Sequence, residues 1–473
     1  MLHVQVADLV TSGGRKGAYV DSMRKLATLL VLLPLFPLLP LTGGCDPATD
    51  AVPTPTQCTA PTGAGTKHAA NITADETWTA AASPHVIPYD MSIRATVTLE
   101  PCATVQIAKQ ITVSLDQPGS VLVAKGEAGR PVTITALDPK TPWAKLRLFN
   151  GGTTSLTYTN VDGGGDRLNT VDYLAAAIEA RADQTKAAAP VLDVHHVKIS
   201  GALANGVIIT EGAGFSDTSE DLVITGSGVH PIHSWGRSAG TIPAGTYTGN
   251  VQDTILLSAG PSGQGDIKED TTFHDRGIPY ELGTANGALE SRLDVDDPSI
   301  PLLTIEPGVT IRFQKDRGKL LIGTAGGDGA AQGAISAIGT ASKPIVFTSA
   351  EPNPAKGDWN GIWFGRTPDP RDRMDYVTVE WAGSDQGKAT GSNSCTKESW
   401  AAVRFMGYGA PTESLMTNVK ILHSGKNAID RGWRADSVAD LSGNGNFFDD
   451  LSGCVQTTPK DHNGACPNPI PCP

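Results

Sequence analysis

The sequence predicts an all-β protein, a parallel β-helix in which short strands stack as the coils of a solenoid, with an internal duplication. The main observation is a phrase that occurs twice, at residues 98–107 (TLEPCATVQI) and at residues 304–313 (TIEPGVTIRF). Short apolar–polar alternations follow both copies in the same order, and clusters of Gly, Asn, Asp and Pro separate them. Repeats of this kind bury their apolar faces only against their neighbours, so the repetition predicts a stack of coils.

The strands of the two halves can be paired one by one. In the first half we predict strands at residues 131–135, 143–149, 158–161 and 197–201, which match 344–348, 359–364, 376–379 and 419–425 in the second. Alternate residues are apolar in most of them, as in a strand with one buried face. The offset between matched residues grows from 206 (98 to 304) to 222 (197 to 419), as expected when insertions go to loops.

Two points leave alternatives open. Residues 173–181 have a helix-forming composition, although their place in the series predicts a further strand. The short strands would also suit a pair of β-sandwiches, but the repeated stretches lack the Asn-Gly signature of tight hairpins. A sandwich is therefore the second choice for the fold.

Composition shifts divide the chain into six predicted segments. They are an upstream extension that is not part of the native protein (1–22), a lipoprotein signal peptide (23–44), a Pro/Thr-rich tether with an N-terminal cap (45–84), β-helix repeat unit 1 (85–290), β-helix repeat unit 2 (291–450) and a Cys-rich C-terminal cap or tail (451–473).

The signal-peptide prediction rests on a positive start at Met23 and a Leu-rich stretch, residues 26–41, that is short and proline-rich for a membrane-spanning helix. The following Leu41-Thr42-Gly43-Gly44-Cys45 resembles the lipobox of bacterial lipoproteins, although its leucine stands four rather than three residues before the cysteine. The resemblance implies export and a lipid on Cys45 that anchors the protein in a membrane, the outer membrane or cell surface being favoured. The alternatives are an ordinary secretory cleavage site and, from the resemblance of Asp46 to an inner-membrane retention signal, the periplasmic face of the inner membrane.

Six cysteines remain after Cys45, and an even number in an exported protein predicts disulfides. We expect Cys58 to pair with Cys102 because both lie near the start of the body. The other four are expected to staple the C-terminal end: Cys395, Cys454, Cys466 and Cys472. A zinc site is the alternative, but no close Cys-x-x-Cys pair supports it, and we predict no metal.

A family resemblance adds to this interpretation. The stretches LTIEPGV (303–309), KPIVFTSA (343–350) and GDWNGI (357–362) look like the right-handed parallel β-helix repeats of bacterial envelope proteins, which are related in fold to pectate lyases. Myxobacterial lipoproteins are similar in style. The resemblance covers residues 85–450 and implies the fold, but not an activity, because one fold hosts many functions.

One ligand-binding stripe is predicted. If the apolar strand residues point inward, then Trp363, Glu380, Arg404 and Lys420 point outward on successive coils and form one ladder. An exposed Trp among charged groups can hold a sugar ring. The alternative is a salt-bridged face with Trp363 covered by a loop.

No catalytic set is predicted. Asp296-Asp297 and Asp449-Asp450 lack the partners of a polysaccharide lyase or hydrolase and are expected in solvated turns. His195-His196 is expected at a solvated corner. His230 and His233 are expected in one loop, where they could share an ion but lack a third ligand.

The composition limits the partners. The net charge of −12 argues against nucleic acid, and no cofactor motif occurs, since the glycines of residues 323–333 lack the Walker lysine. We therefore predict a lipid-anchored envelope protein, a monomer without a cofactor, whose β-helix body recognises a partner such as polysaccharide or is structural. The alternatives are a polysaccharide lyase or glycoside hydrolase, and a purely structural or adhesive surface protein.

Overall fold

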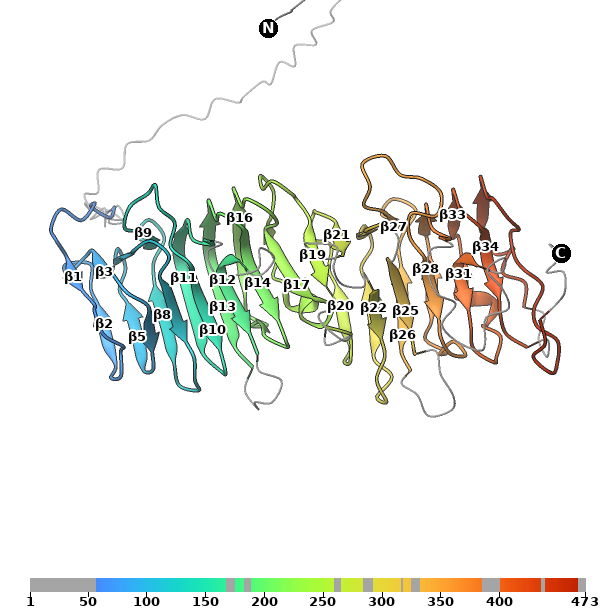
Figure 1. The fold of residues 1–473 in the computed structure, drawn as a ribbon, viewed down its shortest axis with the longest axis horizontal. Coiled ribbons are helices and arrows are strands. Elements are labelled where there is room, and N and C mark those ends of the chain that lie inside the picture. The colour runs from blue at the N-terminus through green and yellow to red at the C-terminus, as the bar shows by residue number, and fades with distance from the viewer. Residues whose placement is uncertain are drawn as a thin grey trace, which may run out of the picture. The chain divides into compact units, whose positions relative to one another are not determined.

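The computed structural model describes residues 57–166, 175–182, 189–258, 265–283, 292–315, 318–324, 332–384, 400–434 and 439–466. Residues Pro53–Pro473 form one compact unit. Its described part contains 35 strands, and they follow one another from the blue to the red end of the stack in Figure 1. No helix in this part is both long and apolar enough to cross a membrane.

The strands belong to four sheets. The 12-stranded sheet contains β1 (Thr66–Lys67), β2 (Glu76–Trp78), β3 (His85–Ile87), β5 (Thr96–Leu99), β6 (Thr104–Ile107), β8 (Val121–Lys125), β9 (Val132–Ala136), β11 (Thr153–Asp162), β13 (Val191–Ser200), β15 (Gly214–Phe215), β16 (Glu220–Thr225) and β18 (Gly245–Thr246). The 13-stranded sheet contains β4 (Met91–Ile93), β7 (Thr112–Leu115), β10 (Lys145–Phe149), β12 (Ala176–Arg181), β14 (Asn205–Thr210), β17 (Ile232–Trp235), β19 (Ile255–Ser258), β21 (Tyr280–Leu282), β24 (Thr310–Phe313), β27 (Ile345–Ser349), β30 (Val377–Glu380), β33 (Lys420–Leu422) and β35 (Phe447–Asp449).

The other two sheets have five strands each and belong to the second half. We call them the β20 sheet and the β22 sheet. The β20 sheet contains β20 (Thr271–Phe273), β23 (Leu302–Ile305), β26 (Ala334–Ile338), β29 (Arg373–Asp375) and β32 (Met416–Thr417). The β22 sheet contains β22 (Arg292–Val295), β25 (Lys319–Ile322), β28 (Gly361–Phe364), β31 (Ala401–Phe405) and β34 (Asn427–Arg431). Two short 3₁₀ helices are described, η2 (Gly236–Thr241) and η5 (Glu413–Leu415).

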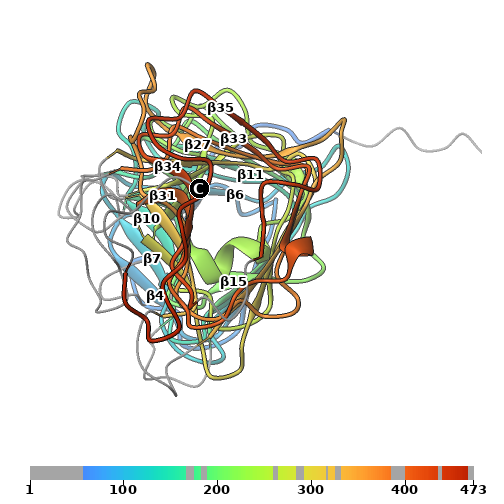
Figure 2. The ribbon, with the colours of Figure 1, turned by 90° about the vertical axis from the view of Figure 1, so that its right-hand side faces the viewer.

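Every pairing between these strands is parallel, and strands that follow each other in sequence mostly lie on different faces of the stack. The chain is therefore a parallel β-helix, as predicted. Viewed along the stack, the coils outline a triangle (Figure 2). The apolar alternation places one side chain of each pair inside, as in β24, where Ile311 and Phe313 are buried and Arg312 faces outward. Residues 176–181 form β12, so a strand is the correct choice for this segment.

The duplication extends to single hydrogen bonds. Trp143 and Trp359, which the sequence pairs, are both fully buried. The indole Nε1–H of Trp143 donates to the carbonyl of Asp162 at 3.1 Å, and that of Trp359 donates to the carbonyl of Glu380 at 2.8 Å. Since Asp162 and Glu380 follow the matched strand residues Val161 and Val379, the two copies share this interaction.

The 13-stranded sheet does not follow the duplication. β6 and β24 are matched in sequence, yet β6 lies in the 12-stranded sheet and β24 in the 13-stranded sheet. Figure 2 shows β7 and β10 on the same side of the triangle as β31 and β34, while β27 and β33 lie on the adjoining side. The 13-stranded sheet therefore passes from one side of the triangle to the next near β17, β19 and β21, the region that also contains η2.

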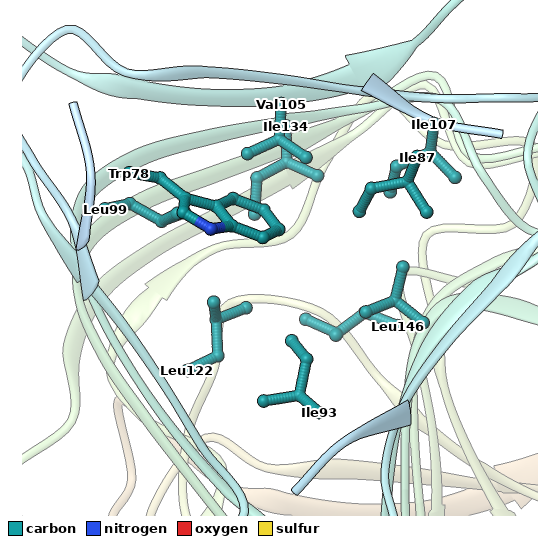
Figure 3. Close-up of a pocket in the computed structure, with 10 residues that line it drawn as sticks. Trp78, Ile87, Ile93, Leu99, Val105, Ile107, Leu122, Ile134 and Leu146 are labelled. Carbon is teal, nitrogen blue, oxygen red and sulfur yellow. The ribbon is translucent and has the colours of Figure 1, made fainter. Parts of the chain in front are cut away.

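The N-terminal coils enclose a small cavity with purely apolar walls (Figure 3). Its lining includes Trp78, Val105, Val113 and Ile134. Trp78 closes this end of the core, where it stacks on the imidazole of His68 with ring centres 4.0 Å apart. Because no polar group lines the cavity, it belongs to the hydrophobic core and offers no partner to a polar ligand.

Candidate binding site at a corner of the solenoid

The structure divides the predicted stripe. Trp363 in β28 and Arg404 in β31 are register neighbours in the β22 sheet. Glu380 in β30 and Lys420 in β33 lie in the 13-stranded sheet instead, where Lys420 is opposite Thr378. The prediction of one ladder of four residues is therefore wrong. Period-two alternation identifies outward positions correctly, but it does not tell which sheet of a triangular coil carries them.

Trp363 is also not exposed. The residue is 5% exposed and Arg404 is 1% exposed, so this pair offers no open surface to a sugar. The guanidinium of Arg404 lies 4.5 Å from the ring centre of Trp363 and 5.2 Å from that of Trp400, and its Nε is 3.3 Å from the Oδ2 of Asp430. Burial raises the pKa of Asp430, and the charge of Arg404 opposes this shift. Around Trp363 and Arg404, the outer face of the β22 sheet is thus a buried, charge-paired cluster.

The cysteines that the structure describes are disulfide-bonded, as predicted. Cys58 and Cys102 form a disulfide across 44 residues of sequence. Cys454 and Cys466 each take part in a disulfide as well. Cys45, Cys395 and Cys472 lie outside the described residues, so the lipid anchor and the remaining connectivity stay predictions.

The histidines do not form an ion site. His230 Nδ1 is 2.9 Å from Thr254 Oγ1, while His233 Nε2 is 2.8 Å from Ser258 Oγ. His233 lies in β17, so the expectation of one loop is wrong for it. Burial lowers the pKa of His230 to about 4. No group of three His, Cys, Asp or Glu side chains suited to a metal ion occurs in the described part of the chain.

Three carboxylates that the sequence did not connect meet near β22. Asp266 Oδ1 accepts the backbone N–H of Asp294 at 3.3 Å, and Arg292 lies 2.5 Å from Asp294 Oδ2. Burial, and then the neighbouring Asp294, raise the pKa of Asp266 to about 7, while burial raises that of Asp294 to about 6. Asp296 completes the group and accepts a hydrogen bond from Thr324. Because Asp266 and Asp294 are only 6% and 1% exposed, they are not placed to reach a polymer in solution.

An exposed site appears where the two copies differ, at the corner that follows β11 and β30. In the first half, Gly163, Gly201 and Gly226 hold this corner on successive coils, each with φ between 63° and 75°. The second half has Trp381, His423 and Asp450 there, with φ of 63°, 54° and 52°.

The backbone hydrogen bonds prove that these corner positions are equivalent. The N–H of Gly163 donates to the carbonyl of Ser200, and the N–H of Trp381 donates to that of Leu422, the residue before the next corner in each half. A left-handed φ suits glycine and strains a residue with a Cβ atom by about 1–2 kcal/mol. A tryptophan in this conformation therefore needs a reason, which backbone geometry alone does not provide.

The three side chains form a continuous stack that we call the Trp381 ladder: Trp381, His423 and Asp450. The rings of Trp381 and His423 are stacked with centres 4.1 Å apart and planes 13° apart. His423 Nδ1 lies 2.8 Å from Asp450 Oδ2, and Lys356 Nζ lies 2.5 Å from Asp450 Oδ1. These bonds from Lys356 and His423 hold the pKa of Asp450 below its usual range.

The ladder is open to solvent. The side chains of His423 and Asp450 are 32% and 50% exposed, and that of Lys356 is 33% exposed. Trp381 is half-buried against the core, which fixes its ring. The result is a rigid indole edge beside an imidazole, a carboxylate and an ammonium group. Such a surface combines apolar contact with both donors and acceptors of hydrogen bonds, the combination that a sugar ring requires.

The sequence predicts only a solvated turn at Asp449-Asp450 and contains no local pattern that marks Trp381 or His423. In the structure Asp449 ends β35, and Asp450 lies at the corner that follows it. The sequence does contain a signal for the site, because a glycine in one copy corresponds to a large residue at the equivalent position of the other. It could be read only once the corner residues were aligned by their hydrogen bonds, since the strands between them differ in length.

Residues 286–396 match a family model described as a pectate-lyase-like β-helix domain. The match spans part of the second half, from β22 to β30, and includes Trp381. Neither a curated protein nor a solved structure matches the chain. The family match agrees with the β-helix that the coordinates show, and this fold is compatible with a carbohydrate-related or a structural role.

Proposed function

We propose that this protein is an exported, lipid-anchored envelope protein that recognises polysaccharide through the Trp381 ladder. The observation that carries the proposal is the replacement of three corner glycines by Trp381, His423 and Asp450. All three residues adopt a conformation that glycine would adopt without strain, and their side chains stack in the open. A scaffold role alone would be met by glycine, as the first half demonstrates.

The chemistry of the ladder favours a glycan. A sugar presents an apolar ring face and a rim of hydroxyl groups, and each hydroxyl both donates and accepts hydrogen bonds. The indole of Trp381 can supply the apolar contact, and Asp450 and Lys356 can supply an acceptor and a donor beside it. A pectate-lyase-like β-helix domain agrees with a polymeric carbohydrate as the partner.

Hydrolysis or lyase chemistry has less support. A retaining or inverting glycosidase needs two carboxyl groups that flank the bond to be broken. In the described part of the chain, the carboxyl groups whose pKa is raised are all buried, and the ladder holds a single carboxylate. These buried groups are Asp266, Asp294, Asp372 and Asp430. We therefore propose recognition rather than catalysis.

The binding proposal is tested by retention of the full chain on immobilised polygalacturonate, alginate, xylan and β-1,4-glucan. Trp381→Gly introduces the residue that the first half has at the equivalent position, so it removes the ring and leaves the backbone unstrained. We expect this variant to lose at least tenfold in affinity. Tyr376→Asn is the matched control, since Tyr376 also has a positive φ (48°) but belongs to no ladder with His and Asp. Equal retention of the wild type and Trp381→Gly would refute the proposal.

The anchoring proposal has its own test. Labelling of cells with a radioactive fatty acid should mark the wild type and leave Cys45→Ala unmarked. Separation of the inner and outer membranes would then assign the protein to one of them. A labelled Cys45→Ala chain would contradict lipidation at this residue.

A further inference from the structure

We infer that the first half carries a second binding site of the same chemistry, formed by Tyr158, His196 and Asp221, so that one polysaccharide is held at two points. We call these three residues the Tyr158 ladder. The inference rests on the proposed function, and it goes beyond it in assigning a new site and a bivalent mode of binding.

The two ladders agree in geometry. The rings of Tyr158 and His196 stack with centres 4.3 Å apart and planes 20° apart, compared with 4.1 Å and 13° in the Trp381 ladder. His196 Nδ1 lies 2.6 Å from Asp221 Oδ2, compared with 2.8 Å. The residues have φ of 41°, 54° and 50°, so all three are again left-handed. Each ladder is therefore an aromatic ring, an imidazole and a carboxylate on three successive coils.

The duplication does not explain this agreement. Tyr158 is matched in the second half by Tyr376, and the next two rungs at that corner are Asn418 and Gly445, with φ of 50° and 75°. Asparagine and glycine tolerate this conformation well, so the corner can be built without His and Asp. The aromatic–imidazole–carboxylate set thus occurs once in each half, at two corners that are not equivalent. A structural requirement inherited from the repeat would have placed both sets at the same corner.

The Tyr158 ladder is open to a ligand. The side chains of His196 and Asp221 are 40% and 57% exposed. The rung below Tyr158 is Gly126, whose position is so close that a Cβ atom would lie 2.2 Å from the carbonyl oxygen of Tyr158. No side chain can therefore cover the lower face of the tyrosine ring from that rung. The turn that follows brings the Glu127–Arg130 ion pair (3.1 Å) to the same corner.

The neighbouring His195 supports a fixed surface beside the ladder. Its Nε2 lies 3.1 Å from Asp193, which also accepts hydrogen bonds from the hydroxyls of Ser155 and Thr218. Burial alone would raise the pKa of Asp193, but these hydrogen bonds, with one from a further serine, outweigh it and hold the pKa below its usual value. The corner is thus ordered by polar contacts before any ligand arrives, which limits the entropy lost on binding.

The spacing decides which ligands can use both ladders. The Tyr158 ladder begins at the coil that precedes β12, and the Trp381 ladder follows β30. Seven strand spacings of the 13-stranded sheet separate β12 from β30, which amounts to about 34 Å along the stack. An oligosaccharide of three sugar units reaches only one ladder, whereas a long polymer can reach both. Linking two sites in this way raises the apparent affinity by about 10²–10⁴-fold.

The experiment compares a polymer with its trimer. The full chain is titrated with whichever of polygalacturonate, alginate, xylan or β-1,4-glucan it retains, and with the trimer of the same sugar. The single variants are Tyr158→Asn, His196→Asn and Trp381→Gly. The double variant combines Tyr158→Asn with Trp381→Gly. Asparagine is the residue found at Asn418, the position equivalent to His196, so the backbone of that corner is preserved. Circular dichroism and thermal melting establish that each variant is folded, and Tyr376→Asn is the matched control.

We expect two trimers per wild-type chain, one for each single variant and none for the double variant, together with at least a tenfold loss of polymer affinity in each single variant. One trimer per wild-type chain, unaffected by Tyr158→Asn and His196→Asn but lost with Trp381→Gly, would overturn the second site and leave the proposed function standing. Absence of binding to all four polymers would overturn both.

Discussion

The buried pair of Arg404 and Asp430 allows a quantitative prediction about stability. Replacement of Arg404 by methionine keeps most of the volume of the side chain but removes the guanidinium that pairs with Asp430, which is 5% exposed. Removing one partner of a buried ion pair costs about 3–5 kcal/mol of unfolding free energy. The guanidinium also lies over the rings of Trp363 and Trp400, at 4.5 and 5.2 Å, and loss of these contacts adds about 1–2 kcal/mol.

Urea denaturation followed by tryptophan fluorescence measures this loss as a shift of the midpoint for Arg404→Met. The double variant Arg404→Met with Asp430→Asn should recover at least half of the loss, since the carboxylate that lost its guanidinium partner is then neutral. The single variant should also gain stability on acidification. Without Arg404 the folded-state pKa of Asp430 rises further above its unfolded value, so the protonated carboxyl favours the folded state at low pH and this stability is lost as pH rises. A loss below about 1 kcal/mol for Arg404→Met, or a double variant no more stable than the single one, would refute this reasoning.

Three further predictions concern the corner, the carboxylates and the duplicated tryptophans. Trp381→Gly should change the unfolding free energy by less than about 1 kcal/mol, because relief of the left-handed φ offsets the lost ring contact; a larger loss in thermal melting would mean that the ring is structural. The folded-state pKa values of Asp266 and Asp294, about 7 and about 6, exceed the unfolded value. The unfolding free energy should therefore fall as pH rises from about 4 toward each of these pKa values, by up to about 1.4 kcal/mol per pH unit and group, and the melting temperature should fall with it. Asp266→Asn should flatten this slope, and a melting temperature that rises over this range would contradict the assignment. Trp143→Phe and Trp359→Phe should each lower the unfolding free energy measured by denaturant titration by about 1–2 kcal/mol, because each leaves a half-buried carbonyl without its indole donor. Clearly unequal losses would show that the two copies do not share this interaction.

Much of the fold follows from local sequence. The alternation in residues 304–313 predicts which side chains of β23 and β24 point inward, and the structure buries Ile305, Ile311 and Phe313 as expected. The order of matched strands predicts β12 against its own helix propensity. The Cys58–Cys102 disulfide follows from the position of both cysteines at the start of the body.

The candidate site was not predictable in the same way. Alternation places Trp363 on the outside of its strand, and that is correct, but this part of the outer face of the β22 sheet is buried, so the residue offers no binding surface. Trp381, at the end of the next matched strand, had no alternation to mark it because it lies at a corner. Its proposed role depends on His423 and Asp450, which come from the following two coils and lie 42 and 69 residues further along the sequence.

The sequence by itself determined the repeat, the strands and the inward or outward direction of their side chains, because a period of two encodes direction within each strand. The tertiary structure alone decided which strands share a ladder, as when β19 and β21 carry the 13-stranded sheet from one side of the stack to the next. It also decided at which corners an aromatic ring, an imidazole and a carboxylate come together. Stacking joins residues that are one full coil apart, and the length of each coil is set by its loops, so the Trp381 ladder and the Tyr158 ladder exist only after the coils have been closed and stacked.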